Sequence, residues 1–381
     1  MDPSQPCTSD HLIFTPGDVD LAHSPLRNGI HQETFVLGAF NPGLCRLPNG
    51  NLLIMVRVAE ALRHAVVNEK VYNIRWEDNK YTTDAWPLKD VNMSDPRTFR
   101  INAYKFAVIG ITSLSWLLPV ELNGDGTAIT TVHYDKIISP RYSSQEYGIE
   151  DPRISFIGGR YYMTTCCASS ERHSTMLYVS GDGLNYECMG IVLDHQNKDM
   201  LLFEGKINNS YFALTRPLGE SYLASPSSSL YHPGAAIHLA SSPDLLHWKP
   251  SDTPFLRARR SSLSNVKIGG GAPPILTKDG WLLLYHGVEN KGNVGIYRTF
   301  WALADKDDPS KIVHLSDDTP LLESNPALTA SLAHQLYLND VVFTTGIVEN
   351  KDEFILASGE LDLACRITRI PKNYFSKTLY N

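Results

Sequence analysis

The chain of 381 residues is long enough for two ordinary domains or one large all-β domain, and it can bury a core without covalent staples. A net charge of −7 argues against a general affinity for nucleic acid or for anionic membranes. Six cysteines without metal-ligand spacing, the lack of a signal peptide and the lack of a long apolar stretch favour a cytoplasmic protein with reduced thiols and no metal.

A two-residue turn followed by a mostly apolar run recurs along the chain, and helical periodicity is almost absent. Asn-Gly, Gly-Gly and Asp-Gly suit tight hairpins because these residues tolerate positive φ. The five copies read NGNLLIMVRV from Asn49, GGRYYMTTCC from Gly158, NNSYFALTRP from Asn208, DGWLLLYHGV from Asp279 and KDEFILASGE from Lys351. A short strand-like run precedes each copy, so the pattern predicts five β-hairpins.

Five hairpins in one all-β chain predict a five-bladed β-propeller, in which radial repetition protects the sheet edges; a two-sheet sandwich is the alternative. We expect residues 31–381 to form this single domain after an N-terminal extension over residues 1–30. The long gap between the first two turns places an insertion or long loops within residues 60–145. Segments beginning at Ser180 and Ser241 indicate turns between outer strands.

The first chemical motif is YGIEDPRISF, in which two acids precede proline and arginine. Pro152 restricts Asp151 to an extended conformation and so aims its carboxylate. Arg153 is placed to hold Glu150 or Asp151. The alternative is a surface ion pair at a corner between a loop and a strand.

The second motif is HQNKDMLLFEGKI, in which charged residues alternate with apolar ones. Strand alternation would place some of Lys198, Asp199, Glu204 and Lys206 on a buried face. The alternative is a solvated edge strand whose charges prevent aggregation.

Cations and a histidine come from later segments. Lys267 precedes three glycines in NVKIGGGAPPIL, which is typical of close approach to an anion but is no nucleotide-binding motif. His286 and Tyr297 lie on successive predicted strands, and Arg57 and Arg216 end two of the hairpin copies. Each residue alone also fits a hydrogen-bonded structural role.

Together these residues indicate one acid facing cations from different blades. The sequence has no Ser-His-Asp order, metal cluster or nucleotide fingerprint. A lone acid opposite Arg and Lys suits attack by inorganic phosphate on an electrophilic carbon, because these cations together can hold the phosphate.

The segments IEDPRISFIGGRYYMT, NKDMLLFEGKI, YFALTRP, VKIGGGAPP and DGWLLLYHGV resemble glycoside hydrolase family 130, the mannoside phosphorylases and their relatives, in order from about Phe35 to Thr345. The family fold is a five-bladed β-propeller. The resemblance implies that Asp151 is the proton donor, acting through a hydroxyl of the mannosyl unit. It assigns phosphate binding to Lys198, Arg216, Lys267, His286 and Tyr297, and mannose binding to Asn41 and Arg57, with Asp199 as a further pocket residue.

Two departures from the family pattern concern carboxylates. FEGK stands where many members have FPRK or FPEK, which places Glu204 near the pocket, and VAE after Arg57 makes Glu60 the match for a mannose-side acid. The Ser-rich segment from Ser225 to Tyr231 and residues 60–145 have no clear counterpart, and we expect these loops to set acceptor specificity.

The resemblance implies an inverting phosphorylase that cleaves β-linked, above all β-1,2-linked, mannooligosaccharides with inorganic phosphate as co-substrate, no cofactor, and mannose 1-phosphate as product. The reaction would be reversible, so the enzyme could extend mannan from mannose 1-phosphate, or from GDP-mannose, whose phosphate would occupy the same site. The loops and the cysteine content also suggest a likeness to the trypanosomatid members of the family. The alternatives are a hydrolase with Glu204 as base and a non-catalytic carbohydrate-binding propeller. The sequence is also compatible with a homo-oligomer.

Overall fold

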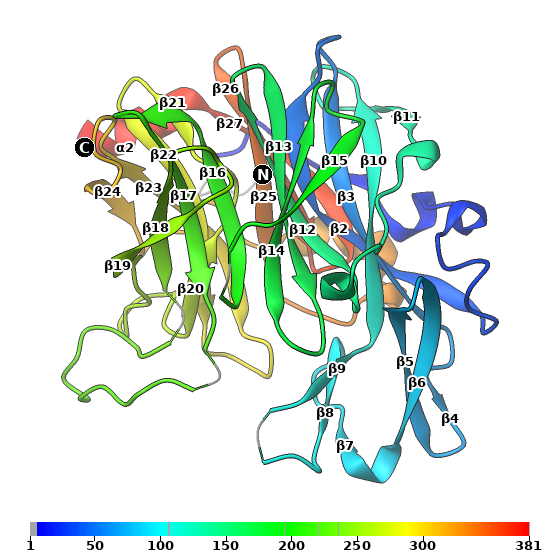
Figure 1. The fold of residues 1–381 in the computed structure, drawn as a ribbon. Coiled ribbons are helices and arrows are strands. Elements are labelled where there is room, and N and C mark those ends of the chain that lie inside the picture. Colours follow the sequence, from blue (N-terminus) through cyan, green and yellow to red (C-terminus); the bar gives the residue numbers. More distant parts are fainter. Residues whose placement is uncertain (1–5, 106, 194, 220, 235, 381) are drawn as a thin grey trace.

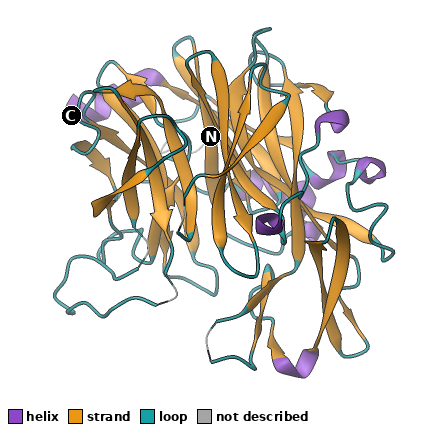
Figure 2. Ribbon diagram, viewed as in Figure 1, coloured by secondary structure: helices purple, strands orange, loops and turns teal. Residues whose placement is uncertain are grey.

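The computed structural model describes residues 6–105, 107–193, 195–219, 221–234 and 236–380. Strands dominate it, and the helical segments are short and peripheral (Figure 2). The helices are α1 (Pro326–Thr329) and α2 (Lys372–Tyr380), with 3₁₀ turns at Pro16–Asp18, Leu21–His23, Leu88–Asp90, Tyr134–Lys136, Ser143–Gln145 and Ala330–Gln335. Among the described helices, none is long and apolar enough to cross a membrane.

Five antiparallel sheets of four or five strands make up most of the molecule (Figure 1). The first contains β2 (Thr34–Arg46), β3 (Leu52–Leu62), β10 (Ser113–Leu122) and β11 (Ile129–Val132). The second contains β12 (Ile149–Ile157), β13 (Arg160–Ala168), β14 (His173–Ser180) and β15 (Tyr186–Ile191). The third contains β16 (Asn197–Ile207), β17 (Ser210–Pro217), β18 (Ile237–Ser242) and β19 (Lys249–Leu256).

The fourth sheet contains β20 (Lys267–Gly270), β21 (Ile275–Thr277), β22 (Gly280–Glu289), β23 (Ile296–Ala304) and β24 (Ile312–Ser316). The fifth contains β25 (Val342–Asn350), β26 (Glu353–Glu360), β27 (Ala364–Pro371) and β1 (Ser9–Phe14). The sequence analysis placed residues 9–14 in an extension before the domain, whereas here they form β1 and pair antiparallel with β27. The two ends of the chain therefore meet in one sheet.

The five predicted hairpins are present, each joining two consecutive antiparallel strands of one sheet: β2–β3, β12–β13, β16–β17, β21–β22 and β25–β26. Their turn residues adopt positive φ, as at Gly158 (56°) and Gly159 (81°), or at Asn208 (49°) and Asn209 (67°). These turns match the right-handed twist of the flanking strands. Local turn chemistry therefore fixes the pairing register.

The middle strands are buried along their whole length because neighbouring sheets cover both faces. In β10 every residue is buried, and in β22 every residue except Glu289. The first strands contact one another in succession: β2 contacts β12, β12 contacts β16 and β16 contacts β20. Strand β25 contacts both β22 and β2, which closes the circuit.

Two small sheets interrupt the first large sheet between β3 and β10. One contains β4 (Val66–Val67), β5 (Lys70–Glu77) and β6 (Lys80–Pro87), and the other contains β7 (Val91–Asn92), β8 (Thr98–Ile101) and β9 (Ile109–Ile111). They lie at one end of the molecule (Figure 1), and β5 contacts β3 and β10 of the first large sheet. Val71, Phe99 and Ile101 form a separate apolar core that joins them. We call residues 66–111 the insertion.

Candidate active site

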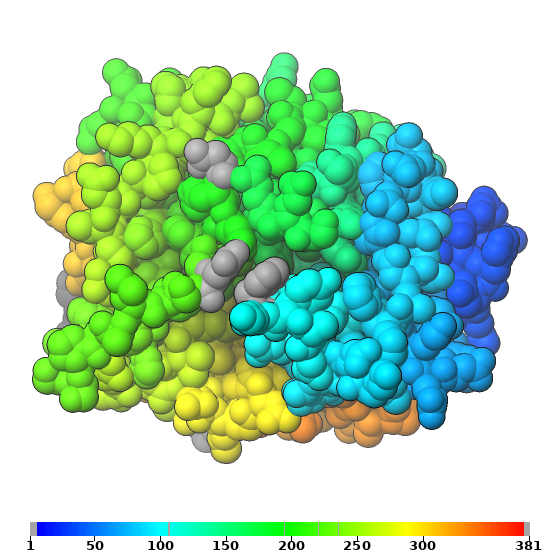
Figure 3. Space-filling model, turned by 60° about the horizontal axis from the view of Figure 1, so that its bottom comes forward, coloured from blue at the N-terminus to red at the C-terminus, as the bar shows by residue number. Residues whose placement is uncertain are grey.

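A cavity of about 440 Å³ gathers polar side chains from all five large sheets and from the insertion. On the face shown in Figure 3, the insertion (cyan) and the segment near residue 290 (yellow) border a recessed area. The predicted site residues that line the cavity are Asn41, Arg57, Asp151, Lys198, Asp199, Arg216, Lys267, His286 and Tyr297. Nine of the eleven predicted residues are therefore brought together, and Glu60 and Glu204 are not among the lining residues.

The same backbone irregularity recurs in three first strands and delivers three of these side chains. Asn41, Asp151 and Asp199 have positive φ (48°, 49° and 55°), each where the pairing register shifts by a bulge. A fourth shift, in β25, falls at Thr345, whose hydroxyl donates to the backbone oxygen of Pro42. Bulges re-aim a side chain, and strained non-glycine backbone clusters at functional sites.

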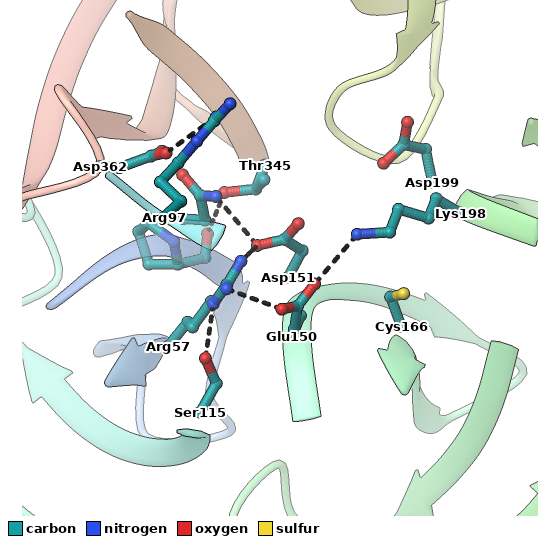
Figure 4. A network of polar contacts seen from close by, with 12 residues as sticks. Arg57, Arg97, Ser115, Glu150, Asp151, Cys166, Lys198, Asp199, Thr345 and Asp362 are labelled. Carbon is teal, nitrogen blue, oxygen red and sulfur yellow. Dashed lines mark hydrogen bonds and ion pairs between the residues drawn. The ribbon is translucent and has the colours of Figure 1, made fainter. Parts of the chain in front are cut away.

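Arg57 holds the acidic pair Glu150 and Asp151, and all three residues line the cavity (Figure 4). Its Nη1 donates to Asp151 Oδ1 at 2.9 Å, its Nη2 to Glu150 Oε1 at 2.8 Å and its Nε to Ser115 Oγ at 3.0 Å. Asn41 Nδ2 also donates to Asp151 Oδ1, at 2.9 Å. Both interactions of the Asp151 side chain use Oδ1, and within the described residues Oδ2 has no hydrogen-bond partner.

Lys198, predicted to bind phosphate, lines the cavity and is paired there with an acid. Its Nζ donates to Glu150 Oε2 at 3.1 Å (Figure 4). Burial raises the pKa of Glu150, but Arg57 and Lys198 outweigh burial and lower this pKa to about 2. Glu150 is therefore an anion that links Arg57 to Lys198.

Asp199 organises the next group of side chains. Its Oδ2 accepts from Arg216 Nε at 2.5 Å and its Oδ1 from Arg153 Nη2 at 3.3 Å. Burial raises the pKa of Asp199, but Arg216, His286 and Arg153 bring it well below the usual range. Arg153 also donates to the backbone oxygen of Asp151 at 2.7 Å. Arg153 thus holds the Asp151 backbone and Asp199, and Arg57 is the residue that holds the acidic pair.

Lys267, Tyr297 and His286 form the side of the cavity contributed by the fourth sheet. Lys267 Nζ lies 5.1 Å from the centre of the Tyr297 ring, and that ring stacks on His286 at 6.0 Å. Of the basic side chains that line the cavity, Lys267 alone has no ion pair within the described residues. Burial lowers the pKa of His286 to about 3, so its ring is neutral, and its Nδ1 is buried without a partner.

The glycines after Lys267 serve side-chain packing in addition to the close approach that their sequence suggests. A Cβ at Gly269 would lie 2.4 Å from Asp199 Oδ2 and 2.4 Å from His286 Cε1, and 2.8 Å from Arg216 Nε. Only glycine leaves room there for these three side chains.

Glu60 lies away from the cavity, which corrects its assignment to the mannose side. Its side chain is fully buried and accepts hydrogen bonds from Ser24 Oγ and Thr34 Oγ1 at 2.6 Å each and from Trp116 Nε1 at 3.0 Å. Side chains alternate along a strand, so a residue three positions after Arg57 in β3 faces the opposite side. Glu60 is a structural carboxylate between the first sheet and the N-terminal segment.

Glu204 also lies elsewhere, which corrects its placement near the pocket. It lines a separate cavity of about 400 Å³ with Cys45, Tyr161 and Glu349. Asp199 and Glu204 belong to the same strand, β16, and five residues of strand span about 17 Å. The cavity that contains Asp151 is thus out of reach of this carboxylate.

The sequence analysis missed several lining residues, among them Asp95, Arg97, His173, Tyr337 and Asp362. Asp95 and Arg97 lie in the insertion, for which no motif was recognised. Asp362 lies in the turn after β26, at the end of the last hairpin copy, and has positive φ (49°). Its place after the same repeat that supplies Arg57 and Arg216 is the one sequence signal for it.

The cavity has balanced charge, although the sequence analysis expected it to be positive. Its basic side chains are Arg57, Arg97, Lys198, Arg216 and Lys267, and its acidic ones are Asp95, Glu150, Asp151, Asp199 and Asp362. No group of three or more His, Cys, Asp or Glu in the described ranges could hold a metal ion. The arrangement offers two carboxylates with free oxygens, Asp151 and Asp362, and an anion-binding side at Lys267, Arg216 and His286.

Comparison with known proteins yields one family. The profile of glycoside hydrolase family 130, described as beta-1,4-mannooligosaccharide phosphorylase, matches residues 111–379. The chain is 31% identical over 358 residues to the β-1,2-mannobiose phosphorylase of Listeria innocua, covering 93% of this chain and 92% of that protein. It is 32% identical over 238 residues to the 1,2-β-oligomannan phosphorylase of a Thermoanaerobacter species, covering 61% and 72%.

The similarity extends to three dimensions. The structure of β-1,2-mannobiose phosphorylase from Listeria innocua in complex with β-1,2-mannobiose matches with a TM-score of 0.81 and 28% identity. The match covers 98% of this chain and 99% of that one.

Proposed function

Because the chain belongs to glycoside hydrolase family 130, we propose that it is an inverting phosphorylase of β-1,2-linked mannosides. The substrates would be a β-1,2-mannooligosaccharide and inorganic phosphate, and the products mannose 1-phosphate and a shortened saccharide. The likeness to phosphorylases of β-1,2-mannobiose and 1,2-β-oligomannan supports this linkage.

We also propose that the five large sheets are the blades of a five-bladed propeller. The closed circuit of contacts among first strands supports this arrangement, as does the pairing of β1 with β27, which would close the last blade with the start of the chain. The site would then lie at one end of the central axis, where the bulged first strands converge.

The phosphate would bind against Lys267, Arg216 and His286. Lys267 brings an unpaired positive charge, Arg216 uses only Nε to hold Asp199, and His286 has a buried nitrogen without a partner. Charged donors bind phosphate oxygens strongly, and two of these groups, Arg216 and His286, are buried. Lys198 would contribute through Glu150, whose charge it balances.

Asp151 would be the general acid. In the reaction a phosphate oxygen forms a bond to the anomeric carbon, the glycosidic C–O bond breaks with inversion, and a proton moves to the leaving oxygen. As the family resemblance suggests, the proton would travel from Asp151 through a hydroxyl of the mannosyl unit. Protonation of Oδ2 would leave the bonds from Asn41 and Arg57 to Oδ1 in place.

The observation that carries the proposal is the unpaired Lys267 beside Arg216 and His286, in the same cavity as Asp151. Asp199 and Glu150 are each held by two cations, Glu204 lies in the other cavity, and the remaining lining acid with little contact, Asp362, lies 3.8 Å from Arg97. Inverting hydrolysis needs a carboxylate base to activate water and has no use for these cationic donors, whereas phosphate is already a nucleophile and is held by them. Phosphorolysis is therefore the better fit.

One assay tests the proposal. The protein is incubated with β-1,2-mannobiose in the presence and absence of phosphate, and the products are identified. We expect mannose 1-phosphate in proportion to added phosphate. Free mannose in phosphate-free buffer would indicate a hydrolase, and binding without turnover would indicate a carbohydrate-binding protein.

We further propose that the reaction is reversible, because mannose 1-phosphate retains much of the energy of the glycosidic bond. The same site would then extend an acceptor from mannose 1-phosphate. GDP-mannose is a second candidate donor, since one of its phosphates could occupy the same anion-binding side. Release of phosphate or GDP during incubation with acceptor and each donor distinguishes the two.

A further inference from the structure

The insertion supplies one of the five basic side chains of the cavity, Arg97. Arg97 lies between β7 and β8 and is held by Asp95: Nε donates to Oδ1 at 3.0 Å and Nη2 to Oδ2 at 2.9 Å. This two-point contact fixes the plane of the guanidinium group. Its remaining nitrogen, Nη1, lies 3.8 Å from Asp362 Oδ2 (Figure 4). Arg97 thus connects the insertion with the fifth sheet across the cavity.

A turn and one hydrogen bond constrain the backbone of Asp362. It lies in the turn between β26 and β27, where Leu361 and Asp362 both have positive φ (56° and 49°). Its backbone oxygen accepts from Tyr337 Oη at 2.8 Å. In the described part of the chain, Arg97 is the only ion-pair partner of its carboxylate.

The electrostatic surroundings of Asp362 come from several elements. The charged groups that face it are Arg97 from the insertion, Arg57 from β3, and Asp151 and Glu150 from β12. Burial raises the pKa of Asp362, Arg97 and Arg57 oppose this rise, and the two acids add to it, so the net direction is upward. Loss of Arg97 would therefore raise the pKa further.

The insertion does not depend on Arg97 for its attachment. Arg75 in β5 donates from Nε to Asp84 in β6 and from Nη1 to Glu146 Oε1, each at 2.8 Å, and the backbone N–H of Trp76 donates to the backbone oxygen of Glu146 at 2.8 Å. The two contacts with Glu146 tie the insertion to the loop that leads into β12. Arg75 does not line the cavity.

We propose that Arg97 is a positioning residue for the sugar side of the site: the insertion delivers it to fix the Asp362 carboxylate beside Asp151, as an acceptor for hydroxyl groups of the mannosyl unit. This inference rests on the proposed function, because it presumes a mannoside in the cavity. The insertion then completes the active site in addition to shaping its entrance.

The test compares Arg97→Ala and Arg97→Lys with Arg75→Ala as the matched control. Initial rates with β-1,2-mannobiose and phosphate give kcat and both KM values, the pH profile of kcat/KM is recorded, calorimetry gives mannobiose binding, and thermal unfolding gives Tm. We expect Arg97→Ala to lower kcat/KM for mannobiose about 10- to 100-fold, the loss of one charged contact. The KM for phosphate should change less than about threefold.

The pH profile separates positioning from a structural role. In Arg97→Ala the acidic side of the kcat/KM profile, called the acid limb, should move to higher pH, because Asp362 stays protonated up to a higher pH without the guanidinium. Arg97→Lys should restore the acid limb of the wild type. Arg75→Ala should lower Tm while kcat/KM stays within about threefold. The proposal is overturned if Arg75→Ala reproduces the loss seen in Arg97→Ala, or if the acid limb of Arg97→Ala does not move.

The calorimetry distinguishes failure of this inference from failure of the proposed function. If the wild type binds mannobiose but does not phosphorolyse it, the proposed function fails. The inference then still requires that Arg97→Ala bind mannobiose at least tenfold more weakly than the wild type and Arg75→Ala. Equal binding by all three proteins would overturn it.

Discussion

Replacement of Lys267 by alanine should weaken phosphate binding with little effect on the fold. Lys267 Nζ has no hydrogen bond or ion pair in the described part of the chain and lies over the Tyr297 ring at 5.1 Å. A hydrogen bond between charged groups contributes about 1.5–3 kcal/mol, which corresponds to a rise of about 10- to 150-fold in the KM for phosphate. Because the folded enzyme loses only the contact with the Tyr297 ring, the free energy of unfolding should change by less than about 1 kcal/mol.

The assay measures initial rates at saturating β-1,2-mannobiose with phosphate varied, together with thermal unfolding. Arg216→Ala is the informative comparison: it should also raise the KM for phosphate, but it leaves Asp199 with Arg153 alone, and breaking a buried pair costs about 3–5 kcal/mol. Lys249→Ala, on the exposed start of β19, is the control and should change neither quantity. A phosphate KM within about threefold of wild type in both Lys267→Ala and Arg216→Ala would refute the anion-binding side.

Three further predictions follow from the site. Asp151→Asn should lower kcat about 100- to 10,000-fold while calorimetry still detects phosphate binding, and turnover above a tenth of wild type would contradict the acid assignment. Glu204→Gln should leave the rate within about twofold, because Glu204 lines the other cavity, and a loss of activity would restore it as a candidate base. Buried His286 has a pKa of about 3, so its ring stays neutral in the folded protein as pH falls from 6.5, whereas the same ring takes up a proton in the unfolded chain. The free energy of unfolding should therefore fall with pH, by about 2 kcal/mol between pH 6.5 and 5. Urea unfolding at both pH values should show a smaller fall for His286→Asn, and equal falls would contradict the buried neutral ring.

The hairpins could be predicted because their signal is local. A tight turn needs particular residues, such as Gly158 and Gly159, and the apolar run after it needs only to be buried. The pairing of β1 with β27 could not be predicted in the same way, because it joins the two ends of the chain and no local pattern records which edge a strand will join. The long gap between the first two turns predicted an insertion or long loops. The two small sheets and the position of the insertion beside the cavity could not be predicted, because they depend on contacts between distant residues such as Arg75 and Glu146.

The predicted residues that belong to the motifs line the cavity, whereas the two that were assigned because they follow a motif residue in the sequence, Glu60 and Glu204, do not. Glu60 follows Arg57 by three positions, and strand alternation puts it on the opposite face. Glu204 follows Asp199 in the same strand, far enough along to reach another cavity. Pairing also escapes a sequence: nothing in the chain indicates that Glu150 balances Lys198 and leaves Lys267 as the unpaired cation.

The bulges explain why neighbouring residues act together in this site. In a regular strand Glu150 and Asp151, or Lys198 and Asp199, would face opposite sides, yet all four line one cavity. Positive φ at Asp151 and Asp199 interrupts the alternation, so each bulged strand contributes two consecutive side chains. The consecutive side chains of β12 and β16 then reach residues of neighbouring strands: Glu150 contacts Arg57 on one side and Lys198 on the other. The strain at these residues is then the cost of concentrating charge at one end of the sheets, and this concentration lets Asp151 and the unpaired Lys267 face the same substrate.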